Sequence, residues 1–341
     1  MKAKVLITGG AGFIGCNLAD RLLTEHREVT IFDNLSRRGC LANLAWLRSR
    51  HGDDSFRLVM ASVTDAATVA QACRDVDRIY HLAGQVAVTT SIVDPRRDFE
   101  DNALGTINVL EGARQSGRDP ILLYASTNKV YGSLEDLAPV AAQRRYTLPD
   151  HPLGIDERHP LDFHSPYGCS KGCGDQYVRD WARIYGMRTV VLRQSCIYGP
   201  RQLGLEDQGW VAHLALSALR GETVTIYGDG KQVRDLLHID DLLAAYELAT
   251  EHISAVAGEV FNIGGGPERS LAVWAEFGPL LEELVGRPVA VRFAPARAGD
   301  QRCFVSDIRK ARRELGWQPQ IGLRDGLADL VAWARANHDT L

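Results

Sequence analysis

Apolar positions in the first half of the chain form short runs that alternate with longer segments of helical periodicity. The run from Val5 to Thr8 is followed by Leu18, Leu22 and Leu23, whose spacing places them on one face of a helix. This alternation predicts an α/β fold with a doubly wound, mainly parallel sheet. The expected strands are 5–8, 29–32, 56–60, 78–83, 121–124 and 189–192.

The pattern changes after Arg193 to shorter elements with more loops. A helix near 211–219, a strand near 224–227 and an amphipathic helix near 327–334 predict a second, smaller α/β domain. We expect a larger first domain over 1–194, to which 234–262 return, and a second domain over 195–233 and 263–341.

Composition narrows the class of protein. The chain has 341 residues, 45% of them hydrophobic, and a net charge of −4, so it can bury one large core or two linked ones without a basic surface for nucleic acid. No apolar run approaches the ~20 residues that span a membrane, and the first run enters a glycine turn rather than a cleavage site, so we expect a cytoplasmic protein. Seven scattered cysteines predict reduced thiols, and no cluster has metal-ligand spacing.

A glycine-rich turn follows the first expected strand. Gly9, Gly12 and Gly15 form G-x-x-G-x-x-G between that strand and a helix. Such a turn lets the backbone approach a pyrophosphate and places the anion at the helix N-terminus. A turn without a ligand is the alternative, but the flanking strand and helix favour a dinucleotide.

Asp33 ends the second expected strand, about 20 residues after the turn, where a carboxylate that binds ribose hydroxyls is expected. Its charge repels a 2′-phosphate and so favours NAD over NADP. Arg37 and Arg38 could receive that phosphate, but we take the carboxylate as decisive.

Tyr167 and Lys171 lie four residues apart at the start of an expected helix, and therefore on one face. A neighbouring ammonium favours the phenolate and lowers a pKa that is about 10 in the free side chain. The pair alone is also typical of a solvated helix. Stretches 81–85 and 125–128 lie at carboxyl ends of expected strands, where ligands of such sheets bind.

These motifs together resemble the extended short-chain dehydrogenase/reductase superfamily, specifically its nucleotide-sugar epimerases and dehydratases, over essentially the whole chain. The resemblance implies a Rossmann fold that binds NAD in the first domain and a nucleotide-sugar-binding second domain. The motifs that carry it are Thr8 to Gly15, Asp33-Asn34-Leu35, His81 to Gly84, Asn102, Val130-Tyr131-Gly132, Tyr167 to Lys171 and Tyr198-Gly199-Pro200.

The resemblance also implies catalytic roles. Tyr167 resembles the family's base, Lys171 its ribose-binding and pKa-lowering partner, and Thr127 the hydroxyl that bonds the reacting sugar oxygen. Sugar 4,6-dehydratases place Asp-Glu after that threonine, whereas this chain has Asn128-Lys129, which disfavours dehydration. The remaining outcome is oxidation to a keto-sugar and return of hydride to the opposite face.

Two sets of binding residues follow from the resemblance. Cys196 stands where many relatives have an asparagine, and Ser62 where an aspartate usually contacts adenine. The expected cofactor contacts are Gly9, Gly12, Phe13, Ile14, Gly15, Asp33, Asn34, Ser36, Arg37, Ser62, Val63, Leu82, Ala83, Gly84, Asn102, Ala125, Tyr167 and Lys171. The expected substrate contacts are Gln85, Thr127, Asn128, Cys196, Tyr227, Arg234, Arg297 and Asp300.

Several stretches, among them 84–91, 161–172 and 207–211, are most similar to one subgroup, the CDP-paratose 2-epimerases. This similarity implies inversion at C2 of a CDP-activated hexose or deoxyhexose. A UDP-hexose or UDP-hexuronate 4-epimerase and a non-catalytic NAD-sensing protein are the alternatives. The resemblance also implies a homodimer or homotetramer that pairs through the Tyr-Lys helix and residues 102–115, whereas it is composition that predicts no nucleic-acid or membrane partner.

Overall fold

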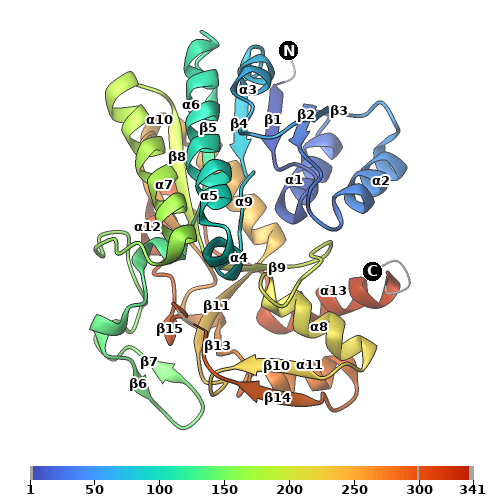
Figure 1. Ribbon diagram of the computed structural model, residues 1–341, viewed down its shortest axis with the longest axis vertical. Helices are drawn as coiled ribbons and strands as arrows, with labels where there is room; N and C mark the ends of the chain where they lie inside the picture. Colours follow the sequence, from blue (N-terminus) through green and yellow to red (C-terminus); the bar gives the residue numbers. More distant parts are fainter. Residues whose placement is uncertain (1–2, 298, 338–341) are drawn as a thin grey trace. The chain divides into compact units, whose positions relative to one another are not determined.

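The computed structural model describes residues 3–297 and 299–337, and its contacts divide the chain into two compact units (Figure 1). Unit 1 runs to Thr127 and adds Ser165–Arg193 and Tyr246–Val260. Unit 2 comprises Asn128–His164, Gln194–Ala245 and the chain from Phe261 onward.

The largest sheet has seven strands in the order β12-β8-β5-β4-β1-β2-β3. The pairs of β1 with β2 and β4, of β2 with β3 and of β4 with β5 are all parallel, so the prediction of a doubly wound parallel sheet is confirmed. The strands are β1 (Lys4–Thr8), β2 (Glu28–Asp33), β3 (Arg57–Met60), β4 (Arg78–His81), β5 (Ile121–Thr127), β8 (Thr189–Gln194) and β12 (Val260–Ile263).

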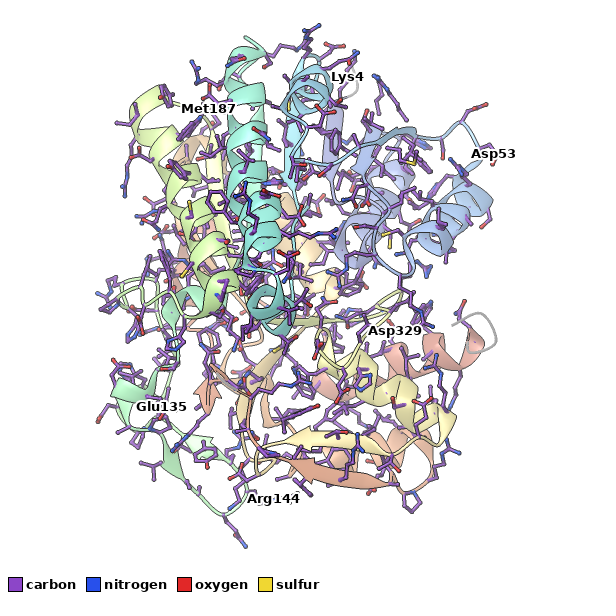
Figure 2. The ribbon with its side chains drawn as sticks, viewed as in Figure 1. Lys4, Asp53, Glu135, Arg144, Met187 and Asp329 are labelled. Atoms are coloured by element: carbon purple, nitrogen blue, oxygen red, sulfur yellow. The ribbon has the colours of Figure 1, made fainter. Side chains whose placement is uncertain are left out.

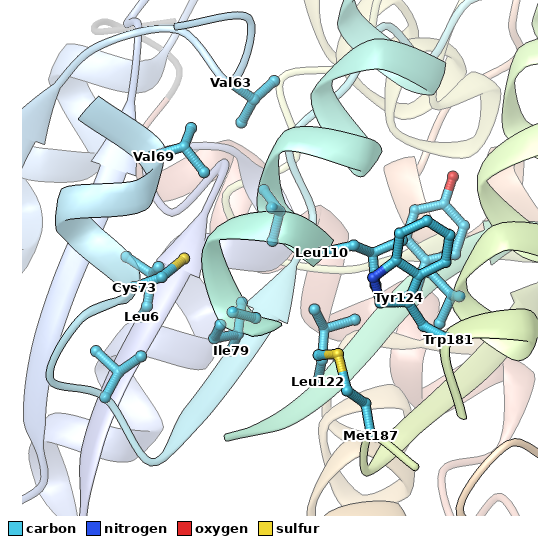
Figure 3. Close-up of a cluster of buried hydrophobic side chains, with 14 of the residues drawn as sticks. Leu6, Val63, Val69, Cys73, Ile79, Leu110, Leu122, Tyr124, Trp181 and Met187 are labelled. Atoms are coloured by element: carbon cyan, nitrogen blue, oxygen red, sulfur yellow. The ribbon is translucent and has the colours of Figure 1, made fainter. Parts of the chain in front are cut away.

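Helices cover both faces of this sheet because successive strand residues point to opposite sides. Leu6, Ile79 and Leu122 pack with residues of α3, α6 and α7 in one buried cluster (Figure 3). Tyr80, the neighbour of Ile79, instead stacks on Tyr246 of α9 with ring centroids 5.9 Å apart. The helices are α1 (Phe13–Thr24), α2 (Cys40–His51), α3 (Ala66–Cys73), α4 (Val88–Val93), α5 (Pro95–Phe99), a π-helical turn (Glu100–Leu104), α6 (Gly105–Gln115), α7 (Ser165–Tyr185), α9 (Ile239–Glu251) and α10 (Ile253–Val256).

Unit 2 has short strands and a core of its own. The parallel pair β10 (Val224–Tyr227) and β14 (Val291–Ala294) is separate from a sheet in which β11 (Val233–His238) pairs with β13 (Ser270–Ala272), β15 (Cys303–Phe304) and β9 (Cys196–Tyr198). Its helices are α8 (Trp210–Arg220), α11 (Phe277–Val285), α12 (Arg309–Leu315) and α13 (Leu323–Ala336), with 3₁₀ turns at Asn128–Tyr131, Glu135–Leu137 and Pro267–Arg269 and a hairpin of β6 (Val140–Ala141) and β7 (Tyr146–Thr147).

The division into units differs from the expected domains at two places. Residues 128–164 group with unit 2, because Tyr131, Leu148 and Ile155 share a buried cluster with Val233 and Phe304. The segment that returns to unit 1 is 246–260 rather than 234–262, since β11 belongs to the small sheet.

Asp53, Glu135, Arg144 and Asp329 are exposed, whereas Met187 is buried (Figure 2). All seven cysteines are free thiols. Within residues 3–297 and 299–337, no helix has the length and apolar character needed to cross a membrane.

Candidate active site

The glycine turn after β1 forms a cradle that only glycine permits. Gly9 has a φ of +71°, and a Cβ on it would lie 2.7 Å from the backbone nitrogen of Ala83. A Cβ on Gly15 would lie 2.3 Å from the carbonyl oxygen of Gly9. Gly12 precedes α1 without a side-chain cap, so the N–H groups of Phe13 and its successors face an open helix N-terminus that suits a phosphate.

Asp33 fixes the carboxyl end of β2 beside this turn. Its carboxylate is buried and accepts hydrogen bonds from the backbone N–H groups of Ala11 (3.0 Å) and Leu35 (2.8 Å). Burial raises the pKa of Asp33, and these hydrogen bonds and the nearby Arg37 oppose that rise. Asn34 Oδ1 accepts from the Ser36 N–H at 3.1 Å and shapes the loop that follows.

The other expected cofactor contacts line the same edge of the sheet. Ser62 and Val63 follow β3, and Leu82, Ala83 and Gly84 follow β4, all at carboxyl ends of parallel strands. A Cβ on Gly84 would lie 2.3 Å from Asn102 Oδ1, a buried atom without a hydrogen-bond partner in the described part of the chain. All residues expected to contact the cofactor belong to unit 1.

Tyr167, Lys171 and Thr127 come together in unit 1. The first two share a face of α7, and Thr127 ends β5; all three are buried. Thr127 hydrogen-bonds the Tyr167 hydroxyl. Lys171 Nζ donates to the Ala125 carbonyl oxygen at 2.6 Å and lies 4.2 Å from the centroid of the Tyr124 ring.

The electrostatics of Tyr167 differ from the expectation that Lys171 lowers its pKa. Burial raises the pKa of the phenol to about 12, and the Asp98 charge also raises it, while Thr127 and Arg37 lower it. The expectation fails because desolvation of a phenolate dominates, and because the Lys171 ammonium is directed at the Ala125 carbonyl. Burial also lowers the pKa of Lys171 to about 7.

The geometry of unit 1 fits NAD. The cradle of the glycine turn, the carboxylate at the end of β2 and the buried Asn102 oxygen offer groups for a pyrophosphate, a ribose and further polar atoms. NAD supplies reversible hydride transfer when bound.

In unit 2, Arg234 and Lys129 converge on Asp300. Arg234 Nη2 lies 2.5 Å from Asp300 Oδ1, and Lys129 Nζ lies 3.6 Å from the same oxygen. Burial opposes ionisation of Asp300, but the two cations outweigh it and lower its pKa. The Cys196 thiol is near both cations and accepts a hydrogen bond from Trp210 Nε1 at 3.4 Å. The sequence analysis did not assign Lys129 to binding, although its place two residues after Thr127 was a usable signal.

The other expected substrate residues have partners within their own units. Arg297 Cζ lies 3.8 Å from the centroid of the Tyr227 ring, and the Tyr227 hydroxyl donates to Glu206 at 2.6 Å. Asn128 Nδ2 lies 3.5 Å from Gln301 Oε1. Gln85 is used in a local turn, in which its Nε2 donates to the Ala87 carbonyl at 2.6 Å.

Two buried carboxylates near Tyr167 and Lys171 were missed from sequence. Asp175 pairs with Arg193 through two hydrogen bonds of 2.9 Å and accepts from the Ser126 hydroxyl at 2.7 Å. Asp98 is fully buried and acts on the pKa of both Tyr167 and Lys171. No motif marks either residue.

A glycine cradle, a carboxylate at the end of β2 and a tyrosine–lysine pair beside a threonine define a short-chain dehydrogenase type of site on a Rossmann fold. A model described as the NAD dependent epimerase/dehydratase family matches residues 5–264, and the chain belongs to this family. The predicted family, the Rossmann fold and the NAD cofactor are thereby confirmed.

Relatives give a finer comparison. The CDP-paratose 2-epimerase of Salmonella typhi is 44% identical over 337 residues, which cover 97% of this chain and 98% of that protein. A UDP-glucose 4-epimerase of Thermotoga maritima, solved with UDP-glucose, has a TM-score of 0.83 and 33% identity and covers 98% of this chain and 99% of its own. A dTDP-glucose 4,6-dehydratase of Streptomyces venezuelae, solved with NAD, has a TM-score of 0.85 and 32% identity over 99% of this chain and 98% of its own.

Proposed function

We propose that the protein is an NAD-dependent isomerase that inverts C2 of a CDP-activated hexose or deoxyhexose, with CDP-paratose and CDP-tyvelose as the model pair. The observation that carries this proposal is the 44% identity to the Salmonella typhi CDP-paratose 2-epimerase over nearly the full length of both chains. The UDP-glucose 4-epimerases and dTDP-glucose 4,6-dehydratases with which the chain was compared are 31–34% identical to it.

Proton transfer is the task of Tyr167. Its oxygen takes the proton of the sugar hydroxyl, and Thr127, which hydrogen-bonds that phenol, holds the sugar oxygen. Lys171 binds the cofactor ribose. NAD, when bound, would accept the hydride from C2 as this proton leaves and would return it to the opposite face of the keto-sugar after that sugar has rotated in the site, so that one carbon is inverted without net oxidation.

The residues after Thr127 support epimerisation over dehydration. Elimination of water needs an acid and a base at the departing hydroxyl and the neighbouring C–H. This chain offers the carboxamide of Asn128 and the ammonium of Lys129, and Lys129 is paired with Asp300. Neither group supplies the acid–base pair that dehydration requires.

The two cations on Asp300 support binding of a diphosphate. Arg234 and Lys129 share one carboxylate, which leaves an excess of positive charge in that part of unit 2. Charge-assisted hydrogen bonds to phosphate oxygens are among the strongest that arginine makes. We assign Arg234 and Lys129, with Arg297, to the diphosphate of the nucleotide sugar, and Tyr227 to its nucleoside.

A UDP-sugar 4-epimerase is the second candidate, because the Thermotoga maritima UDP-glucose 4-epimerase shares the fold over 98% of this chain at 33% identity. A non-catalytic NAD sensor is less well supported, since it would have no use for Thr127 and Tyr167 hydrogen-bonded to each other in a buried site.

A panel of nucleotide sugars tests the proposal. Purified protein would be incubated with CDP-paratose, CDP-glucose, UDP-glucose and UDP-glucuronate, and the inverted carbon located by proton NMR. Inversion at C2 of a CDP-sugar is expected, and a Lys171→Met variant would serve as a preparation without turnover. Inversion at C4 alone would overturn the 2-epimerase assignment.

The proposal also includes self-association of the chain. Ile184 and Tyr185 on α7 and Leu104 in the 102–115 segment are 66%, 50% and 39% exposed. Apolar surface of this kind supports a homodimer or homotetramer that pairs through α7 and residues 102–115. Light scattering on the native chain and on Ile184→Asp tests the oligomeric state, and a monomeric native chain would contradict the proposal.

We also infer a cytoplasmic location for the protein, which its free cysteines support.

A further inference from the structure

The side chain of Asn102 forms a buried hydrogen bond that sets the direction of its carboxamide. Asn102 lies in the π-helical turn at Glu100–Leu104, and Asp98 lies four residues earlier, on α5. The two side chains are 1% and 0% exposed, and Asn102 Nδ2 donates to Asp98 Oδ1 at 3.1 Å. An ionised carboxylate can only accept hydrogen bonds, so the NH2 group of Asn102 must face Asp98 and its oxygen must face away.

Asp98 suits this task because it accepts hydrogen bonds from two residues. The Ser170 hydroxyl, on α7, also hydrogen-bonds the carboxylate. Burial raises the pKa of Asp98, and the hydrogen bonds from Ser170 and Asn102 oppose that rise because they favour the charged form. An amide at this position would present a donor as well as an acceptor, whereas the carboxylate presents acceptors only.

The oxygen of the Asn102 carboxamide lies beside Gly84, three residues beyond the end of β4. A Cβ on Gly84 would come within 2.3 Å of Asn102 Oδ1, so a larger residue would displace this oxygen. Oδ1 is buried and has no hydrogen-bond partner within residues 3–297 and 299–337. Buried acceptors are normally satisfied, and this one lies past the carboxyl end of a parallel strand, where dinucleotides bind. It is therefore suited to accept from an N–H or O–H group of NAD.

The backbone that carries Asn102 is also held in place. The Thr106 hydroxyl donates to the Asn102 carbonyl oxygen at 2.5 Å and must therefore accept from His81 Nε2, 3.0 Å away. Burial lowers the pKa of His81 to about 3, so the ring is neutral and its single N–H is at Nε2. Nδ1 then accepts from the Thr8 hydroxyl at 2.7 Å, and Thr8 Oγ1 accepts from the Ala83 N–H at 3.2 Å. One chain of hydrogen bonds thus joins the π-helical turn to β1 and to the loop after β4.

We propose that Asp98 is a positioning residue for the cofactor, which fixes the Asn102 carboxamide so that its oxygen is presented to a hydrogen-bond donor of NAD. The inference depends on the NAD site of unit 1 and not on the identity of the sugar. Without Asp98 the carboxamide can rotate and present its NH2 group at the same place, because its two orientations have nearly the same shape. A donor of NAD would then face a donor of the protein.

Reversal of the hydrogen bond tests the inference through NAD binding alone. The rise of the unfolding midpoint with NAD concentration at pH 8 gives the dissociation constant of NAD for each full-length variant. Asp98→Asn permits either orientation, so this constant should increase about three- to tenfold. Asn102→Asp brings two carboxylates together and should increase it about tenfold or more. The double variant exchanges donor and acceptor but keeps an acceptor toward NAD, so we expect a constant within about threefold of the native value.

Asp101→Asn is the matched control. Asp101 is next to Asn102 in the chain, but its carboxylate is ion-paired with Arg97 at 3.5 Å, so the dissociation constant should not change. An equal increase in this control would overturn the inference, as would additive losses from Asp98→Asn and Asn102→Asp. A purely structural role for Asp98 would lower the midpoint without NAD and leave the dissociation constant unchanged, and that result would also refute the inference.

The test still decides if one variant is unstable. If Asn102→Asp cannot be purified, addition of Asp98→Asn is expected to restore folded protein, and an equally unstable double variant would contradict the inference. Because no sugar is turned over, the result stands whatever the nucleotide-sugar panel shows.

A parallel titration with 3-acetylpyridine adenine dinucleotide, which has a methyl ketone in place of the amide of nicotinamide, identifies the donor. If Asp98→Asn loses affinity for NAD alone, the Asn102 oxygen accepts from the nicotinamide amide. An equal loss for both dinucleotides assigns the donor to a hydroxyl or amine elsewhere in NAD. No loss for either dinucleotide would overturn the inference.

Discussion

Tyr167→Phe is the most direct test of the proposed chemistry. The change removes one hydroxyl, which hydrogen-bonds Thr127, and leaves the ring in its buried position. Loss of a single hydrogen bond costs about 1 kcal/mol of unfolding free energy, so the variant should fold and retain NAD. The phenol does not form the glycine cradle or bond to Asp33, so cofactor content should match that of the native protein.

The effect on turnover should be much larger. A positioned general base contributes roughly 10²- to 10⁴-fold, so kcat should fall by that factor, or ~3–5 kcal/mol in activation free energy. The pKa of about 12 adds a second expectation. Because the ionised phenol is the active form and is scarce at neutral pH, native activity should rise with pH on the acid limb by up to about tenfold per unit. The variant should lose that dependence.

The assay is C2 inversion of the CDP-sugar followed by proton NMR across pH 6–9, with bound NAD measured after denaturation. Tyr177→Phe is the matched control, because Tyr177 lies on the same helix and is 41% exposed. Normal turnover by Tyr167→Phe would refute the assignment of Tyr167 as the base. Loss of NAD together with activity would show that the effect is on binding instead.

Three further substitutions test other parts of the site. Asp33→Ala removes the carboxylate that disfavours a 2′-phosphate, so the ratio of NADP to NAD affinity, measured by fluorescence titration, should rise; an unchanged ratio would remove Asp33 from the ribose site. Asp175→Asn leaves Arg193 buried without its carboxylate and should cost about 3–5 kcal/mol in denaturant unfolding, whereas a change below ~1 kcal/mol would contradict the role of this pair. Arg234→Met leaves Lys129 as the one cation of this pair on Asp300. The KM for the nucleotide sugar should rise about tenfold or more, with a smaller effect on kcat. An unchanged KM would contradict the assignment of Arg234 to the diphosphate.

The periodicity of the sequence predicts the sheet well because buried parallel strands need continuous apolar runs. The runs at 5–8 and 29–32 appear as β1 and β2, and the glycine turn lies where the motif places it. Strand ends are less well predicted: β5 extends to Thr127, whereas the expected strand ends at Tyr124. Ser126 and Thr127 are polar but buried, and their hydroxyls are satisfied by side chains distant in sequence.

The residues that the sequence did not reveal were missed for one common reason. Asp98 hydrogen-bonds Ser170, and Lys129 pairs with Asp300, through contacts between distant parts of the chain. A single sequence records no such pairing. The pKa of Tyr167 was predicted in the wrong direction for a related reason, since the i, i+4 spacing to Lys171 is visible in sequence and the burial that outweighs it is not.

The division of the chain into units separates reaction from recognition. The chain leaves unit 1 directly after Thr127 and re-enters it at Ser165, two residues before Tyr167. The groups assigned to proton transfer thus belong to one unit, while Lys129, Arg234 and Arg297, assigned to the diphosphate, belong to the other. Mutations that adapt the enzyme to a different activated sugar can therefore accumulate in one set of gene segments while the segments that encode the redox chemistry stay unchanged.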